Sequence, residues 1–171
     1  DNSLIITASR DGTSRVFDTQ TGRELQIFKG HNGHVHKAKL SYDNKLAITL
    51  SDECIYIWNV QTGEQLFLLK GHCDDVSDVF FVENNKYLVS FGRDHKTILW
   101  DVATGKQLYT RLQLENNDWL VYDEHYRFDG TEGAIDYLYL TCGLEVIDLA
   151  QVKDSLWIPG LVEKIMNNEE I

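Results

Sequence analysis

The sequence predicts an all-β fold built from repeated four-stranded antiparallel sheets. Two observations lead to this prediction: a set of residues that recurs about every 41 residues, and short apolar segments separated by turns of Asp, Asn and Gly. The composition agrees, because 43 % of the 171 residues are hydrophobic and there is a single proline. Such a chain can bury a core and is unlike a disordered one.

An aromatic residue followed by Asp or Asn marks each repeat, and it recurs at intervals of 41 and 42 residues. The three pairs are Phe17-Asp18, Trp58-Asn59 and Trp100-Asp101. A Thr-Gly pair follows each of them at the same offset, and an aspartate precedes each aromatic by six residues. These aspartates are Asp11, Asp52 and Asp94. Lys-Gly-His also recurs, ending at His31 and His72. Several residue types held at one spacing define a structural repeat.

The second unit shows how each repeat divides into strands. Its four apolar segments are Val35–Leu40, Lys45–Leu50, Cys54–Trp58 and Gln65–Leu69. Along Cys54–Trp58 the apolar side chains point to both faces, which indicates a sheet covered on both sides. Four-stranded sheets that stack with a period of about 40–45 residues are the blades of a β-propeller.

The Gly-His, Asp-turn and Trp-Asp pattern of residues 1 to about 111 resembles that of WD-repeat propellers. In that family the histidine, the turn aspartate and the aromatic residue are linked by hydrogen bonds inside each blade. The resemblance implies such structural networks in the second and third units. Their members would be His31, Asp52 and Trp58, then His72, Asp94 and Trp100, with Asp11 at the matching turn of the first unit.

Two departures from the family pattern predict that these networks are incomplete. The first unit carries Phe17, which lacks the N–H donor of tryptophan. Leu50 and Gly92 stand where the first unit has Ser9, so a hydroxyl is missing from both other units.

The repeat also predicts what surrounds the three units. The first begins at its second strand, and three units are fewer than the roughly 4–8 blades of a closed propeller. We therefore expect residues 1–116 to be WD-repeat blades from the C-terminal half of a longer propeller. The alternative is that copies of the chain assemble to close a ring.

Residues 117–171 are expected to form a different unit, a degenerate final blade with a helical cap. Residues 1–111 have a charge balance of −1, whereas residues 112–171 have a balance of −10. Trp119–Asp123, Tyr126–Phe128 and part of Tyr137–Ile147 have the pattern of strands. Apolar residues then recur at helical spacing in two segments, one capped by Asp148 with Gln151 and one with Pro159 in its first turn. The apolar positions are Leu149, Val152 and Leu156, then Leu161, Val162, Ile165 and Met166.

This second unit resembles a module that follows the propeller in some bacterial WD-repeat proteins. The matching motifs are Trp119, Phe128-Asp129-Gly130, Gly143-Leu144-Glu145-Val146-Ile147 and Pro159-Gly160-Leu161. Proteins with this arrangement often continue into a caspase-like peptidase or another effector domain. The resemblance therefore implies a regulatory module that controls such an effector.

Three residue clusters suggest chemistry, and each has a simpler explanation. His31, His34 and His36 lack the further ligands of a tetrahedral metal site, so we expect no metal. Cys142 with His125 does not match the caspase nucleophile motif, and the parity of Cys142 with neighbouring leucines favours a buried thiol. The carboxylates around Asp129-Gly130 match a calcium loop only in part, which favours a solvated acidic surface.

Composition excludes several function classes. A net charge of −11 disfavours a general nucleic-acid binder, and no apolar run approaches the ~20 residues of a membrane span. The three cysteines form no CxxC pair, so a cytoplasmic protein is expected. No nucleotide or cofactor motif is present, so we expect no cofactor, no small-molecule substrate and no catalytic residue.

The sequence therefore favours a non-catalytic scaffold that binds proteins through the loops of its blades. Arg10 and Arg93 each immediately precede a turn aspartate, and they are the residues expected to contact a partner. The alternative is part of a propeller enzyme with its active site at the central channel, where clustered carboxylates or histidines would gather.

Overall fold

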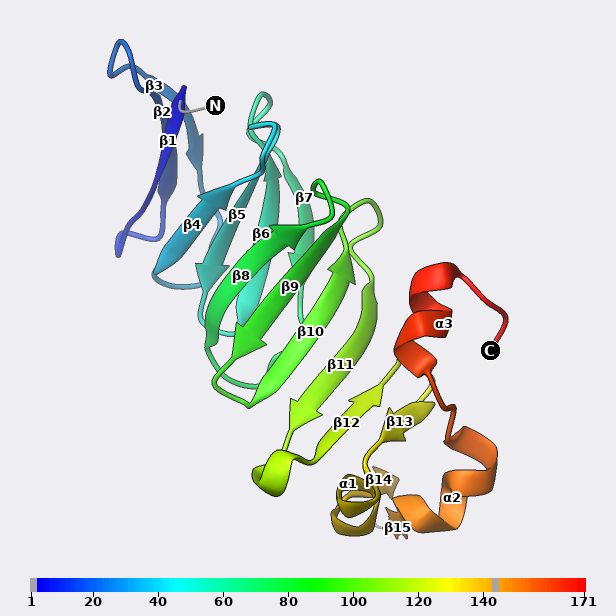
Figure 1. The fold of residues 1–171 in the computed structure, drawn as a ribbon. Helices are drawn as coiled ribbons and strands as arrows, with labels where there is room; N and C mark the ends of the chain where they lie inside the picture. The colour runs from blue at the N-terminus through cyan, green and yellow to red at the C-terminus, as the bar shows by residue number, and fades with distance from the viewer. Residues whose placement is uncertain (1–2, 143–144) are drawn as a thin grey trace. The chain divides into compact units, whose positions relative to one another are not determined.

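The computed structural model describes residues 3–142 and 145–171, which form two compact units (Figure 1). Unit 1 comprises the chain up to Asp94 together with Trp100–Lys106, and unit 2 comprises His95–Leu99 together with Gln107–Ile171. Between Leu4 and Leu108 every residue is described, and none is in a helix. The predicted β architecture of the repeat region is therefore confirmed.

The first two repeats form separate antiparallel sheets in unit 1. The first sheet has three strands in the order β1-β2-β3, namely Leu4–Ala8, Ser14–Asp18 and Glu24–Phe28. The second has four strands in the order β4-β5-β6-β7, namely Lys37–Leu40, Leu46–Ser51, Cys54–Asn59 and Gln65–Leu69. The four expected segments of the second repeat are thus all strands, and the first sheet has one strand fewer, as predicted.

The third repeat contributes four consecutive strands of a six-stranded sheet. These are β8 (Val76–Val82), β9 (Tyr87–Gly92), β10 (Lys96–Asp101) and β11 (Gln107–Gln113). The sheet continues with β12 (Trp119–Tyr122) and β13 (Phe128–Gly130), in the order β13-β12-β11-β10-β9-β8. A short 3-10 turn, η1 (Glu115–Asn117), reverses the chain so that Leu112 of β11 lies opposite Leu120 of β12. Of the strands that were expected to open a further blade, β12 therefore pairs with β11, and β13 pairs with β12.

The recurrent pattern of Asp or Asn followed by x-x-Thr-Gly is a turn that leads into the last strand of each repeat. In the first repeat the Asp18 carboxylate accepts the Thr21 backbone N–H and the Thr21 hydroxyl, both at 2.7 Å. Gly22 follows with φ 69°, a left-handed conformation that glycine adopts without steric cost. Gly63 and Gly105 repeat this conformation, which explains why the pattern recurs.

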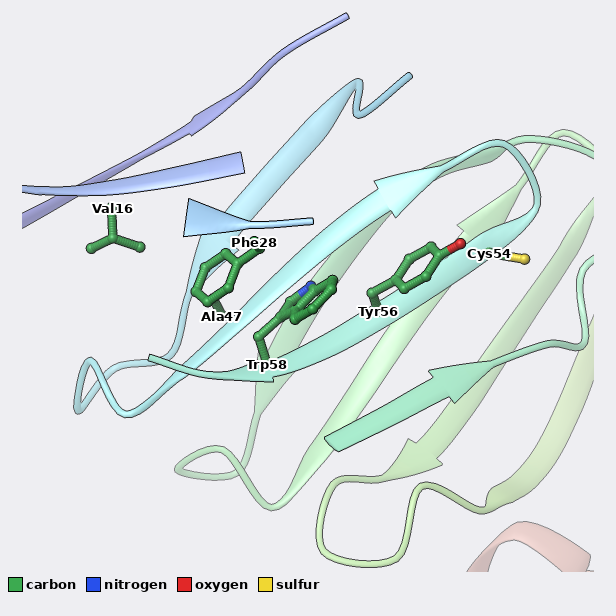
Figure 2. Packing of buried hydrophobic residues seen from close by; sticks show 6 residues of the cluster. All are labelled: Val16, Phe28, Ala47, Cys54, Tyr56 and Trp58. Carbon is green, nitrogen blue, oxygen red and sulfur yellow. The ribbon is translucent and has the colours of Figure 1, made fainter. Parts of the chain in front are cut away.

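The core of unit 1 joins the first and second sheets, as Figure 2 shows. Phe28 stacks on Trp58 with their ring centroids 5.1 Å apart, and Tyr56 stacks on the other side of Trp58 at 5.9 Å. Ile55 and Ile57 alternate with these aromatics along β6 and are 1 % and 0 % exposed. Both faces of the second sheet are therefore buried, as the sequence predicts.

Unit 2 adds a hairpin and three short helices. The hairpin pairs β14 (Tyr139–Cys142) with β15 (Glu145–Asp148), and the helices are α1 (Glu132–Tyr137), α2 (Leu149–Leu156) and α3 (Leu161–Asn167). The two predicted helices are α2 and α3, whereas α1 was not predicted from the sequence. No helix in the described ranges has the length or the apolar character needed to cross a membrane.

The core of unit 2 explains the apolar stripe of α2. Leu149 is 2 % exposed and packs in a cluster with Leu120, Phe128, Ala134 and Ile135. Val152 and Leu156 pack against the same cluster. This stripe therefore covers the strands of its own unit.

Two details of the predicted helix ends are wrong. Asp148 occupies the N-cap position of α2, but its side chain makes no capping hydrogen bond. Pro159 precedes α3 instead of lying in its first turn, because Gly160 has a left-handed φ of 72° and the helix begins at Leu161. The chain thus turns at Pro159-Gly160 before it becomes helical.

Candidate functional site

A hydrogen-bonded network lies inside the third repeat, entirely within unit 1. The indole N–H of Trp100 donates to the Ser90 hydroxyl at 2.8 Å, and Ser90 Oγ is 2.8 Å from Nε2 of His72. Nδ1 of His72 is 3.0 Å from Oδ1 of Asp94. Because the indole can only donate, one tautomer satisfies the whole chain: Ser90 donates to Nε2, and Nδ1–H donates to Asp94. The side chains of His72 and Asp94 are 1 % and 7 % exposed, so the network is buried.

The second repeat has a related network with a different end. The indole N–H of Trp58 donates to the Thr49 hydroxyl at 2.8 Å, and Thr49 Oγ1 is 2.7 Å from Nε2 of His31. Nδ1–H of His31 then donates to the backbone carbonyl of Gly12 at 2.8 Å, in the first repeat. Burial lowers the pKa of His31, although the hydrogen bond to Gly12 opposes this effect. The imidazole is therefore held in its neutral form.

Thr49 and Ser90 are the hydroxyl residues that the sequence analysis missed. The residues two positions before the turn aspartates are Leu50 and Gly92. Neither has a hydroxyl, so the networks were expected to be incomplete. The hydroxyls instead lie on β5 and β9, nine and ten residues before the tryptophan. Thr49 and Ser90 are both fully buried among apolar strand residues. A single hydroxyl residue within an otherwise apolar strand was the feature of the sequence that could have identified them.

The turn aspartates differ in what they contact. The expected link between Asp52 and His31 does not form, because Gly12 and Thr49 occupy both ring nitrogens of His31. Asp52 is exposed, and its carboxylate lies so close to Gly33 that a Cβ there would come within 2.6 Å of Oδ2. Asp11 accepts the Thr13 hydroxyl and backbone N–H at 2.7 and 2.9 Å. Those two bonds lower the pKa of Asp11 and close its own turn.

A continuous rim joins the turns of the three repeats with the loops that follow them. The Val35 N–H donates to the Ser9 carbonyl at 3.1 Å, and the Val76 N–H donates to the Asp52 carbonyl at 3.0 Å. The Arg93 N–H donates to the Asp75 carbonyl at 2.9 Å. The turns of the first two repeats are thus bonded to the loop of the next repeat, and the turn of the third repeat is bonded to a loop of its own repeat.

Arg10 and Arg93, the predicted contact residues, lie at the two ends of this rim. Both side chains are exposed. The backbone carbonyl of Arg10 accepts a hydrogen bond from Nδ1 of His34. The guanidinium of Arg93 pairs with Asp75 at 3.4 Å, and because its side chain is 69 % exposed, it remains available to a partner.

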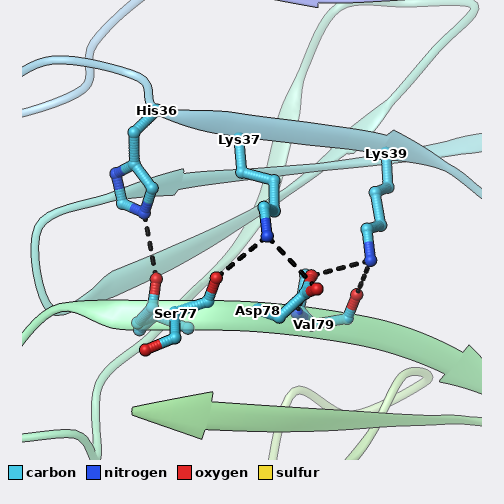
Figure 3. A network of polar contacts seen from close by, with 7 residues as sticks. His36, Lys37, Lys39, Ser77, Asp78 and Val79 are labelled. Carbon is cyan, nitrogen blue, oxygen red and sulfur yellow. Dashed lines mark hydrogen bonds and ion pairs between the residues drawn. The ribbon is translucent and has the colours of Figure 1, made fainter. Parts of the chain in front are cut away.

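A second set of polar contacts links β4 to β8, the first strands of two consecutive repeats (Figure 3). Nζ of Lys37 and of Lys39 donate to the carbonyls of Ser77 and Val79 at 3.0 and 2.7 Å. Both lysines also bind the carboxylate of Asp78, at 3.2 and 2.7 Å. Burial raises the pKa of Asp78, but these hydrogen bonds outweigh it and leave the pKa below its ordinary value. The side chains of β4 therefore satisfy carbonyls at the edge of β8.

The three histidines of the expected loop cluster do not converge. His31 binds the Gly12 carbonyl, His34 binds the Arg10 carbonyl, and His36 Nε2 binds the Val76 carbonyl at 2.9 Å. Each imidazole thus has a separate structural partner, and this geometry gives no common point for a cation.

The carboxylates near Asp129 also have structural partners. Asp129 accepts the indole N–H of Trp157 at 3.2 Å through Oδ1 and the Gly160 N–H at 2.8 Å through Oδ2. It therefore connects the segments Phe128-Asp129-Gly130 and Pro159-Gly160-Leu161. Asp123, whose side chain is 4 % exposed, binds the Arg127 guanidinium at 2.6 Å.

The pairing of Cys142 with His125 lies outside what the structure describes. His125 is exposed, and its N–H donates to Asp123 at 2.9 Å. The side chain of Cys142 and residues Gly143-Leu144 are not among the described parts.

Comparison with known proteins identifies the repeats. Residues 22–59 and 63–101 match the family model "WD domain, G-beta repeat". The chain is 28 % identical over 107 residues to pre-mRNA-processing factor 19 of Caenorhabditis elegans, which covers 62 % of this chain. It is 31 % identical over 109 residues, 61 % of the chain, to pre-mRNA-processing factor 19 homolog 2 of Arabidopsis thaliana. Over 58 residues, 33 % of the chain, it is 33 % identical to nuclear distribution protein PAC1-2 of Uncinocarpus reesii (strain UAMH 1704).

The matched regions are a small part of these proteins, since they span 22 %, 21 % and 13 % of their respective lengths. The solved structure of U3-55K is similar with a TM-score of 0.60 at 25 % identity, covering 72 % of this chain and 43 % of that one. The relatives from Caenorhabditis elegans, Arabidopsis thaliana and Uncinocarpus reesii are eukaryotic, and their similarity does not support the expected bacterial or caspase-linked assignment. Residues 22–59 and 63–101 therefore match the pattern of WD repeats, and the fold is that of a partial β-propeller with short C-terminal helices.

Proposed function

We propose that the chain is a non-catalytic, cytoplasmic protein-interaction scaffold whose contact surface is the rim between Arg10 and Arg93. The observation that carries the proposal is the rim itself. Its turns and loops are fixed by backbone hydrogen bonds and by the networks beneath, while its arginines stay exposed. A surface fixed before binding loses little conformational entropy when a partner docks. Protein recognition is also the common role of WD-repeat domains.

The alternative, an active site at the central channel, has less support. An enzyme needs convergent polar groups that are free to act on a substrate. On β4 and β8, and at His36 just before β4, the candidate groups bind one another or backbone carbonyls. They are His36, Lys37, Lys39 and Asp78. Their geometry supports the role of joining two blades.

We further propose that residues 117–171 transmit the state of the blades to an effector domain of the same protein. Its resemblance to the module of bacterial WD-repeat proteins favours an effector such as a caspase-like peptidase. The bonds from Asp129 to Trp157 and Gly160 support a rigid connection, because they fix the segment before α3 against β13.

The rim is tested by charge reversal. In a pull-down from the native host, the double variant Arg10→Glu, Arg93→Glu should lose partners that the unaltered protein retains. Arg23→Glu is the matched control, because Arg23 is an exposed arginine in the turn between β2 and β3. Equal retention by the double variant and the unaltered protein would contradict the rim as the contact surface.

The module is tested by deletion of Asp148–Ile171. This deletion removes α2 and α3 and uncovers Leu120, Phe128 and Ile135, which are at most 5 % exposed. At roughly 25 cal/mol per Å2 of apolar surface, their exposure should lower the melting temperature and promote aggregation. An unchanged melting temperature and unchanged solubility would show that the helices do not cap the strands.

A further inference from the structure

A small cavity lies in unit 2 on one face of the β11–β12 pair. Its volume is about 250 Å3, and it is lined by Tyr109, Arg111, Trp119, Val121 and Val162. Arg111 pairs with Val121, and the next residue of the same parity on β12, Trp119, pairs with Gln113. Residues two apart on a strand share a face, so the four strand residues form one wall. Val162 of α3 forms another.

Arg111 is the one charged residue among the five that line this apolar cavity. Its guanidinium carbon lies 5.7 Å from the centroid of the Trp119 ring, and Nη2 donates to the Gln113 side chain at 3.3 Å. Arg15, Arg93 and Arg127 each bind a carboxylate, whereas within the described ranges no carboxylate lies in ion-pair distance of Arg111. Its planar fork keeps further donors for an incoming carboxylate.

The size of the cavity indicates the class of ligand. Cofactors and drug-sized molecules usually occupy about 300–1,000 Å3, so this cavity has room for one large side chain rather than for such a ligand. Tyrosine, tryptophan and arginine are also enriched where protein interfaces bury their anchoring residues. Burial raises the pKa of Tyr109, so its hydroxyl stays protonated.

We propose that this cavity binds a peptide segment of a partner protein in which a large apolar residue is next to a single carboxylate. The apolar side chain packs between Tyr109, Trp119 and Val162, and the carboxylate binds Arg111. The inference rests on the proposed function of protein recognition, but it uses a surface other than the rim.

The charge of the unit restricts the number of carboxylates. Residues 112–171, which make up most of unit 2, have a charge balance of −10, so this part of the unit repels a segment with several acidic residues. One carboxylate gains the contact with Arg111 at the smallest repulsive cost. We therefore expect selectivity for an isolated acidic residue.

The test uses the full chain and pairs of short capped peptides that differ in one residue, Leu-Glu against Leu-Gln at the centre. Binding is followed through the indole N–H resonance of Trp119, assigned with Trp119→Phe. The Leu-Glu peptide should shift this resonance to saturation and bind about tenfold more tightly than the Leu-Gln peptide, equivalent to about 1.4 kcal/mol. A peptide with additional glutamates should bind more weakly. Equal affinity of the pair, or no saturable shift, would overturn the inference.

A variant assigns the effect to the cavity. Arg111→Gln should reduce the affinity for the Leu-Glu peptide to that for Leu-Gln, while Arg23→Gln, at an exposed arginine outside the rim, should leave it unchanged. An unaffected Arg111→Gln variant would overturn the inference. If that variant does not fold, the peptide pair on the unaltered protein still decides. The rim variants report on the proposed function separately, so loss of partners in Arg10→Glu, Arg93→Glu with no peptide effect would leave the rim standing and remove the cavity.

Discussion

The second and third repeats each link a tryptophan, a hydroxyl residue and a histidine in a buried network, yet the two networks end in different places. In the third repeat His72 binds Asp94 of its own turn. In the second repeat His31 binds the Gly12 carbonyl of the preceding repeat. One histidine therefore closes a blade on itself, and the other ties two blades together.

The difference follows from one residue in the turn. Two residues, Asp52 and Glu53, connect β5 to β6, whereas three residues, 93–95, connect β9 to β10. In the shorter turn Asp52 has a φ of 51° and lies against Gly33. In the longer turn Asp94 reaches both His72 and the backbone N–H of Cys73. The length of the turn, and not the presence of an aspartate, decides which bond forms.

The largest expected effect is that of His72→Ala. This change removes one hydrogen bond from the buried Asp94 carboxylate and one from the buried Ser90 hydroxyl, which should cost about 1–3 kcal/mol in the free energy of unfolding. Urea denaturation measures the loss, and His125→Ala is the control, since His125 is exposed. Equal stability of His72→Ala and the unaltered protein would show that the network is not needed for folding.

Replacing the turn aspartates tests the comparison directly. Asp94→Asn should lower the free energy of unfolding by about 1 kcal/mol, because a charge-assisted acceptor of two hydrogen bonds is weakened. Asp52→Asn should change it by less than about 0.5 kcal/mol, because Asp52 is exposed and makes no bond to His31. Equal losses in the two variants would mean that the turns are equivalent after all.

A smaller effect is expected from pH. Because the pKa of His31 is lowered in the folded state, the unfolded chain binds the proton first. The stability that depends on neutral His31 is present above the ordinary pKa of about 6.5 and is lost as the pH falls through it toward the folded value. Denaturation curves across this range should show a slope that is reduced in His31→Gln. An identical slope in the variant would contradict a neutral, buried His31.

The smallest effect is expected from Phe17→Trp in the first repeat. The new indole should not create a third network, because the Thr7 hydroxyl of that sheet is exposed and donates to the Arg15 carbonyl at 3.4 Å. The free energy of unfolding should therefore change by no more than about 0.5 kcal/mol. A gain near 1 kcal/mol would show that a donor was the only missing part.

Strand positions in the repeats were predictable because residues such as Ile55, Tyr56, Ile57 and Trp58 report burial on two faces directly. The networks were less predictable. A spacing counted from the turn aspartate fails when the turn changes length, and only three-dimensional contact shows that Thr49 and Ser90 accept the indole protons. The partner of His31 is a backbone carbonyl, Gly12, and a carbonyl leaves no mark in a sequence.

In unit 2 the periodic stripes identified α2 and α3, but α1 and the pairing of β12 with β11 were not predicted. The six residues Glu132–Tyr137 of α1 are too few for a helical period to stand out. The pairing depends on how η1 reverses the chain through Asn116 and Asn117, both in left-handed conformations. The role of Asp129 in holding Gly160 depends on contacts 31 residues apart in the chain.

The bond from His31 to Gly12 has a consequence for how the repeats fold. In a linear array of repeats, stability is approximately the sum of the intrinsic stability of each repeat and the coupling between nearest neighbours. The bond between His72 and Asp94 adds to the intrinsic stability of the third repeat. The bond between His31 and Gly12 adds to the coupling between the first and second repeats. Cooperativity between the first two repeats therefore gains a polar contribution as well as the aromatic packing around Trp58. A single-residue insertion in the turn after β5 would be enough to replace the bond that couples two repeats with a bond that stabilises one repeat.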